Sequence, residues 1–129
     1  MLISTFLQSV REGPNEPCLY RLDGNIWVAF SRQAVLDAAL KLCGQWKIDG
    51  LNPDDRILLL MENRPEWAVT AIASGLYGLV LVPAYTTHRP HEIQYLLDRS
   101  EASAVMTSDG ELLARIQTLS ITASLPLYC

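Results

Sequence analysis

Few residues of this 129-residue sequence have the types and spacing that metal or catalytic chemistry requires. His88 and His91 lie three positions apart and could approach one metal ion, but Pro90 separates them and the sequence offers no obvious third ligand. We therefore predict two solvent-exposed imidazoles there and no metal site. The sequence has no glycine-rich phosphate loop, no Gly-x-Ser-x-Gly nucleophile turn and no close Cys/His cluster.

The acidic side chains do not form a recognisable acid–base pair. Asp54, Asp55, Glu62 and Glu66 fall in expected turns and loops. No pattern around them predicts the burial or pairing that would perturb a carboxyl pKa. We predict solvated charges at these positions and assign no catalytic residue to the chain.

Two arginines stand directly before prolines, at Arg64-Pro65 and Arg89-Pro90. Each pair follows an expected strand and opens an expected helix. Both guanidinium groups would then lie near one edge of a sheet, beside helix N-termini, where anions are favoured. The alternative interpretation is two solvated loop arginines.

The elements that would position these residues begin with a hairpin and a helix. Residues 18–30 predict two strands around Asp23-Gly24, a pair suited to a tight turn. Ser31 is a good N-cap for a helix that closes at Gly50. Helices are also expected from Pro65 to Tyr77, from Pro90 onward and after a cap at Asp109.

The continuous apolar run in residues 56–61 (RILLLM) predicts a strand buried on both faces, as in a parallel sheet. Residues 79–83 predict the next buried strand, residues 103–107 (SAVMT) a third, and the terminal LPLYC a fourth. This order predicts an α/β fold: a parallel sheet with helices packed on it, plus an N-terminal β-hairpin.

The stretch GLYGLVLVPAYTT, residues 75–87, shows what such a fold needs. Ala71, Ala73 and Gly75 would allow a helix to pack closely on the sheet. Residues 79–82 would be a central strand, and residues 85–87 would form the loop at its carboxyl end. Open parallel sheets bind ligands at that edge.

Composition indicates a globular protein rather than a nucleic-acid partner. Half of the residues are hydrophobic, 19% are charged, the net charge is −4, and no basic stripe is present. Cys18, Cys43 and Cys129 are far apart, which favours free thiols and a cytoplasmic location. We expect no signal peptide in the first 14 residues. We also expect no membrane span in the uncharged stretch 67–87, which a buried helix and strand explain better.

The most specific pattern in the sequence is NRPEW…GLYGLVLVPAYTTHRPHEIQYLLDRSEA. It combines an Asn-x-Pro-Glu-Trp start, a small-residue helix, a Val-Pro strand end and a Pro-x-Glu helix. In this pattern the sequence resembles the amino-terminal region of AMP-forming acyl-CoA ligases, of the adenylate-forming superfamily, from about Leu19 to Asp109. The hairpin YRLDGNIWVAFS is similar to that of the long-chain fatty acyl branch.

The resemblance implies a reaction in which a fatty acid carboxylate attacks ATP, with Mg²⁺, to give an acyl-adenylate. Coenzyme A then displaces AMP. The family's Ser/Thr/Gly-rich Pro-Lys-Gly loop, its Tyr-Gly-x-Thr-Glu segment and its late lysine do not occur here. We therefore expect residues 1–129 to be the N-terminal part of the AMP-binding domain of a longer fatty acid–CoA ligase. Alone it would be inactive and would bind no cofactor.

Site residues also follow from the resemblance. In some family members, the loop after the Val-Pro strand lies near the adenine nucleotide of coenzyme A. Here that loop is Tyr85, Thr86 and Thr87, and Arg115 could reach a nucleotide phosphate. The family commonly has Ser or Thr at the helix starts where this chain has arginine, which predicts weaker caps by about 1 kcal/mol each.

Two alternatives stay open: a free-standing α/β binding module, and the N-terminal part of an amino-acid adenylation domain. A part of a larger enzyme would expose apolar surface, so self-association is expected. Peripheral contact with a membrane is left open.

Overall fold

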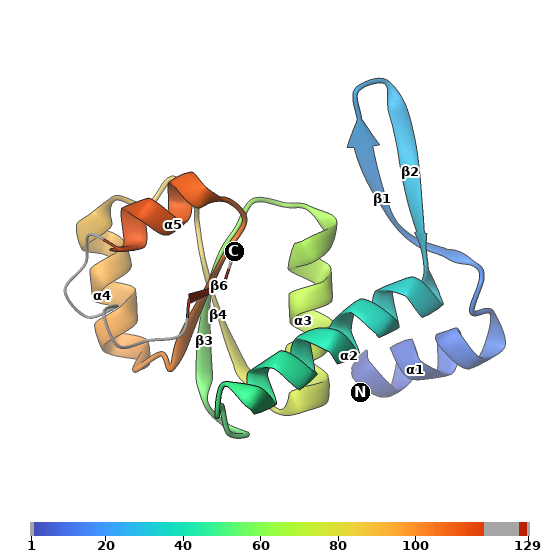
Figure 1. The fold of residues 1–129 in the computed structure, drawn as a ribbon, viewed down its shortest axis with the longest axis horizontal. Helices are drawn as coiled ribbons and strands as arrows, with labels where there is room; N and C mark the ends of the chain where they lie inside the picture. Colours follow the sequence, from blue (N-terminus) through green and yellow to red (C-terminus); the bar gives the residue numbers. More distant parts are fainter. Residues whose placement is uncertain (1, 118–126, 129) are drawn as a thin grey trace.

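The structure is a computed structural model that describes residues 2–117 and 127–128. Helices and strands alternate along most of the chain (Figure 1). In chain order the elements are α1 (Leu2–Glu12), β1 (Pro17–Asp23), β2 (Ile26–Ser31), α2 (Arg32–Ile48), β3 (Arg56–Leu60), α3 (Pro65–Tyr77), β4 (Val80–Ala84), α4 (Pro90–Ser100), β5 (Ala104–Thr107), α5 (Gly110–Gln117) and β6 (Leu127–Tyr128).

A parallel sheet with strand order β4-β3-β5-β6 forms the centre of the molecule. Leu60 at the end of β3 pairs with Ala84 of β4 on one side and with Thr107 of β5 on the other. The carboxyl ends of these strands are therefore level, and the loops that follow them leave from one edge. The predicted α/β fold with a parallel sheet and an N-terminal hairpin is confirmed.

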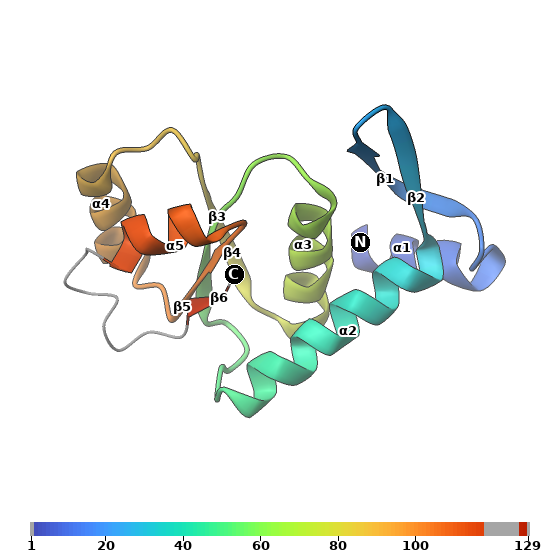
Figure 2. The same cartoon turned by 45° about the horizontal axis from the view of Figure 1, so that its top comes forward.

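Helices cover both faces of the sheet, which gives three layers (Figure 2). Along β3, Ile57 and Leu59 pack with residues of α2 and α3. Leu58 and Leu60 point the other way and pack with residues of α4 and α5. These four side chains have no exposed area, because a strand in the middle of a covered sheet buries both faces.

The prediction that residues 79–82 form a central strand is wrong. β4 lies at the end of the strand order and pairs only with β3 among the described strands. Val80 is 46% exposed, whereas β3 and β5 occupy the interior positions. An apolar run predicts a buried strand, but it does not show how many strands lie beside it, and within β4 only Ala84 is buried.

Local signals set the helix boundaries as predicted. The Ser31 hydroxyl accepts a hydrogen bond from the Ala34 N–H (3.1 Å), and the Asp109 carboxylate accepts one from the Leu112 N–H (2.9 Å). Pro65 and Pro90 open α3 and α4. Their N-cap arginines have no side-chain acceptor, so neither can cap its helix in this way.

Helix α1 was not among the predicted elements, and it changes the role of Gly75. A Cβ atom built on Gly75 would lie 2.5 Å from Cγ1 of Ile3. Gly75 therefore makes room for α1 rather than for the sheet, while Ala73 packs in the sheet core as expected. Gly78 ends α3 with φ +92°, a left-handed conformation that glycine adopts without steric cost.

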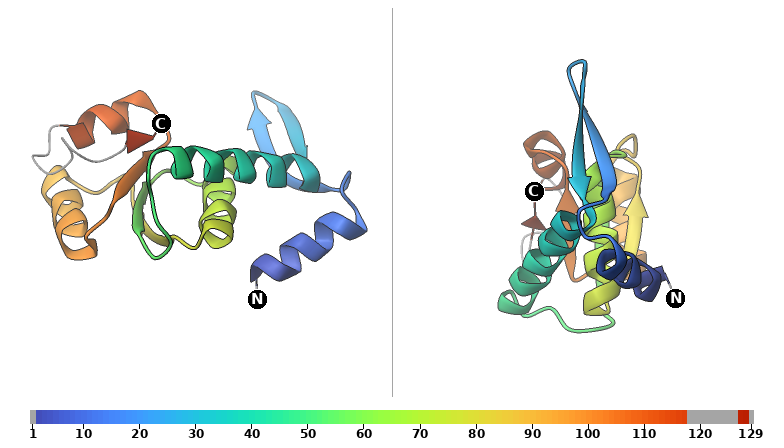
Figure 3. Two further views of the ribbon diagram at one scale, coloured as in Figure 1. Left: turned by 60° about the horizontal axis from the view of Figure 1, so that its bottom comes forward. Right: turned by 90° about the vertical axis from the view of Figure 1, so that its right-hand side faces the viewer.

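The β1–β2 hairpin projects from the body of the molecule (Figure 3). Its turn is centred on Gly24 and Asn25, one residue later than predicted, with Gly24 at φ +63°. Four of its large apolar side chains are more than half exposed, namely Tyr20, Leu22, Ile26 and Trp27.

Within the described residues, no helix is long and apolar enough to cross a membrane. Cys18 and Cys43 are free thiols, as predicted, and Cys129 lies outside the described residues. Desolvation raises the pKa of Cys43, so its thiol favours the neutral form.

Candidate ligand pocket at the carboxyl edge of the sheet

Three loops start side by side at the carboxyl edge of the sheet. They connect β3 to α3, β4 to α4, and β5 to α5. The level ends of the strands bring these loops together, although they lie far apart in the sequence.

A pocket of about 550 Å³ lies between the first two loops. One wall consists of Met61, Glu62, Asn63 and Trp67, and the other consists of residues 83–87. The predicted site residues Tyr85, Thr86 and Thr87 therefore line one pocket together. Arg115 lies in α5, and the position of its side chain is outside the described part of the chain.

Tyr85 is held at the rim of this pocket by His88. The Tyr85 N–H donates a hydrogen bond to His88 Nδ1 (3.2 Å), and the two rings meet edge to face at 5.3 Å. The Tyr85 side chain is nevertheless 75% exposed, so its ring faces solvent. These two contacts of His88 hold the β4–α4 loop in place.

In the described residues, no group of three or more His, Cys, Asp or Glu side chains could hold a metal ion.

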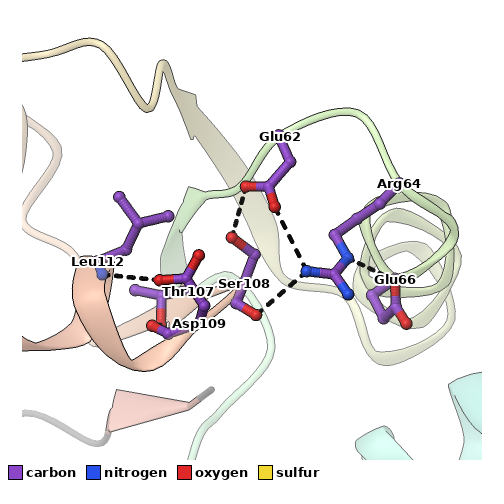
Figure 4. A network of polar contacts seen from close by, with 7 residues as sticks. All are labelled: Glu62, Arg64, Glu66, Thr107, Ser108, Asp109 and Leu112. Carbon is purple, nitrogen blue, oxygen red and sulfur yellow. Dashed lines mark hydrogen bonds and ion pairs between the residues drawn. The ribbon is translucent and has the colours of Figure 1, made fainter.

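A polar network joins the β3–α3 loop to the β5–α5 loop (Figure 4). Ser108 Oγ donates to Glu62 Oε2 at 2.6 Å, and Arg64 Nη1 donates to the Ser108 carbonyl oxygen at 3.3 Å. Arg64 also contacts Glu62 Oε1 at 3.4 Å and, through Nε, Glu66 Oε2 at 2.9 Å. Glu62 and Glu66 are therefore exposed, as predicted, but both are paired with Arg64, and Glu66 lies in the first turn of α3 rather than in a loop.

This network lowers the pKa of Glu62. The largest cause is the hydrogen bond from Ser108, followed by a bond to the backbone, while burial opposes them and Arg64 adds a smaller favourable effect. The nearby Asp109 carboxylate raises the pKa slightly. Glu62 is thus held as a carboxylate, which suits a structural acceptor rather than a proton donor.

The other predicted charges have separate roles. Asp55 accepts a hydrogen bond from the Asn52 N–H (2.8 Å) before β3, and Asp54 adopts φ +73° in the same turn, at the edge opposite the pocket. Glu92 accepts the Arg89 N–H (3.0 Å), which lowers its pKa. Among the described residues, the Arg89 guanidinium forms no ion pair.

The walls of the pocket carry polar and aromatic groups that could bind a ligand. Its walls offer a phenol, two threonine hydroxyls, the Asn63 amide and the Trp67 indole. Its titratable carboxylate, Glu62, already accepts hydrogen bonds from Ser108 and Arg64. The described walls therefore supply hydrogen bonds and aromatic faces, and they supply no nucleophile paired with a base.

Comparisons with known proteins agree with this fold. A family described as AMP-binding enzyme matches residues 6–126. Long-chain-fatty-acid–CoA ligase 5 of Rattus norvegicus is 32% identical over 108 residues, which cover 81% of this chain and 16% of that protein. Long chain acyl-CoA synthetase 4 of Arabidopsis thaliana is 28% identical over 114 residues, covering 83% of this chain and 17% of that protein.

Among solved structures, a benzoate CoA ligase from Burkholderia xenovorans LB400 matches with a TM-score of 0.84 and 22% identity, over 97% of this chain and 24% of that chain. The chain belongs to the AMP-binding enzyme family and has the fold of the N-terminal domains of adenylate-forming enzymes. It spans less than a fifth of the length of the curated relatives named above.

Proposed function

We propose that the chain is the N-terminal part of the AMP-binding domain of a fatty acid–CoA ligase and forms one wall of its coenzyme A site. The observation that supports this most directly is the pocket at the carboxyl edge of the sheet, which Tyr85, Thr86 and Thr87 line together. Ligands of parallel sheets bind at this edge. Membership of the AMP-binding enzyme family also supports a nucleotide-containing ligand for this pocket.

The fatty acid is proposed as the acyl substrate because the two sequence relatives named above are long-chain ligases. Solved structures at 22% identity or below support the fold alone. No contact in the described residues favours an amino acid instead, so the adenylation domain remains the weaker alternative.

In this proposal the chain binds and orients one substrate. Threonine hydroxyls and the Asn63 amide would hydrogen-bond the polar parts of coenzyme A, and the exposed Tyr85 ring would offer a face to its adenine. Arg115 is proposed to meet a phosphate. Mg²⁺ and ATP would be used by the whole enzyme, and since no described cluster fits a metal ion, we assign no Mg²⁺ step to this chain.

The first test uses the 129-residue chain alone. Pyrophosphate exchange with palmitate and ATP should not exceed a heat-killed control, because the chain carries none of the family's phosphate-binding loop. Coenzyme A should bind in the millimolar range at best, because one wall recovers little of the ordering cost of binding. Turnover by the chain would contradict the proposal.

The second test uses a longer protein that contains this chain. Replacing Thr86 and Thr87 with phenylalanine should raise the KM for coenzyme A and leave adenylate formation nearly unchanged. Thr5→Phe, on the exposed side of α1, is the matched control. An equal loss of adenylation and thioester formation would show that the loop is structural.

A further inference from the structure

We propose that Glu62, Arg64 and Ser108 form a latch that holds the β3–α3 loop in the position that shapes the pocket. Arg64 is its central positioning residue. The consequence for coenzyme A rests on the function proposed above, whereas the effect on the pocket wall does not.

The latch joins segments that the sequence separates by 44 and 46 residues. Ser108 is held at two points, because its hydroxyl donates to Glu62 and its carbonyl oxygen accepts from Arg64. Two bonds to one residue fix its orientation as well as its distance. The end of β3 is therefore tied to the end of β5 through side chains as well as through the sheet.

The pocket lies on the other side of the same loop. Glu62 and its neighbour Asn63 line the pocket opposite Tyr85, Thr86 and Thr87. Any movement of the β3–α3 loop away from β5 would carry the Asn63 amide toward the β4–α4 loop and narrow the space between them. The latch opposes this movement.

The geometry of Arg64 distinguishes it from an ordinary surface charge. Its side chain is 34% exposed, and it contacts two carboxylates and a carbonyl oxygen at once. The Arg56–Glu101 pair, at the other end of β3, is a single contact of 4.0 Å between side chains 49% and 82% exposed. Such exposed pairs contribute little. The planar fork of donors in arginine suits the three acceptors, and a lysine ammonium would not satisfy them together.

The same contacts argue against an anion site at Arg64. Glu62 and Glu66 place two negative charges on one guanidinium, so the cluster is acidic overall. The positive charge of Arg64 is neutralised by these two carboxylates and is not available to bind a free anion.

The test compares variants of the 129-residue chain by ¹H–¹⁵N NMR. Arg64→Met should shift the backbone amides of Thr86 and Thr87, which lie on the opposite wall of the pocket. Arg56→Met is the matched control, since it removes an Arg–Glu pair from the opposite end of the same strand, and it should leave these signals in place. Shifts confined to residues 62–66 and 107–110 would overturn the proposal.

Substitutions at Ser108 change the structure less than Arg64→Met does. They test the latch by the same NMR signals even if Arg64→Met fails to fold. Ser108→Ala removes the donor and should move the same pocket signals, whereas Ser108→Thr keeps a hydroxyl and should restore them. Pocket signals that are equal in both variants would overturn the latch.

A titration with coenzyme A separates this inference from the proposed function. If the pocket binds it, Arg64→Met should weaken binding several-fold while Arg56→Met does not, and equal binding by the two variants would count against the latch. If the wild-type chain shows no shift at Thr86 or Thr87 with coenzyme A, the proposed site fails, and the latch is judged by the amide shifts of the variants alone.

Discussion

The hydroxyl of Ser108 has the largest effect on the pKa of Glu62. Its carboxylate faces the Ser108 hydroxyl, the Arg64 guanidinium and the Asp109 carboxylate, and Arg64 is shared with Glu66. Because the pKa of Glu62 is lowered in the folded state, its stabilising effect is fully present above the ordinary pKa that it has in the unfolded state. That effect is lost as the pH falls through the lower, folded-state pKa.

We predict that Ser108→Ala raises the pKa of Glu62 toward its usual value, because the largest cause of the shift is removed. Carboxyl ¹³C NMR titration of Glu62 in both proteins measures this directly. Thr5→Ala is the control. If Glu62 titrates at the same pH in Ser108→Ala and wild type, the hydrogen bond does not control its charge.

Arg89 is the second residue with a specific expectation. Glu92 already accepts the Arg89 N–H, which is one half of a capping box, and arginine cannot supply the other half. Arg89→Ser should complete the box and raise the free energy of unfolding by about 1 kcal/mol. Urea denaturation measures the gain, and Arg89→Ala, which also lacks an acceptor, should stay within a few tenths of a kcal/mol of wild type. No difference between the serine and alanine variants would contradict the expectation.

At the scale of elements, the contact between α1 and α3 depends on one missing side chain. Gly75→Ala should gain up to about 1 kcal/mol of helix propensity. Its methyl would however press on Ile3, and such overpacking costs about 1–3 kcal/mol.

We therefore expect Gly75→Ala to destabilise the wild-type chain and to stabilise the Ile3→Ala variant. A double-mutant cycle by urea unfolding measures this change of sign. Equal effects of Gly75→Ala in both backgrounds would mean that Ile3 moves aside at no cost.

Most elements could be predicted because their signals are local. Pro65, Pro90 and Ser31 mark helix starts by their own backbone and side-chain chemistry, and the apolar run of β3 shows a strand buried on both faces. Helix α1 was also predictable, since Ile3, Phe6, Leu7 and Val10 have helical spacing. The edge position of β4 was not, because strand order depends on pairing between distant segments.

The candidate site also has a part that the sequence could predict and a part that it could not. Tyr85, Thr86 and Thr87 could be predicted because they directly follow a strand whose carboxyl end faces ligands. The link from Glu62 and Arg64 to Ser108 could not, because it requires β3 and β5 to be neighbours in the sheet. A prediction for Arg115 needs a side-chain position that the described residues do not include.

At the scale of the whole molecule, the exposed apolar side chains of the hairpin should drive self-association. Tyr20, Leu22 and Trp27 lie on one face, since Leu22 pairs with Trp27 and Tyr20 pairs with Ala29. We expect light scattering to show a concentration-dependent mass, and Leu22→Ser with Trp27→Ser to restore the monomer. Ile48→Ser, at a position that is 80% exposed at the end of α2 and outside the hairpin, should not restore it. A monomeric wild-type chain at high concentration would contradict this.

The place of β3 between β4 and β5 also has a kinetic consequence. Among the described strands β4 pairs only with β3, and β3 also pairs with β5, so we expect the folding transition state to contain β3. The projecting hairpin forms its pairs within itself. Ile57→Val should then slow refolding, and Val28→Ala should mainly accelerate unfolding. Stopped-flow chevron plots separate the two effects, and an Ile57→Val change found only in the unfolding limb would place β3 outside the folding nucleus.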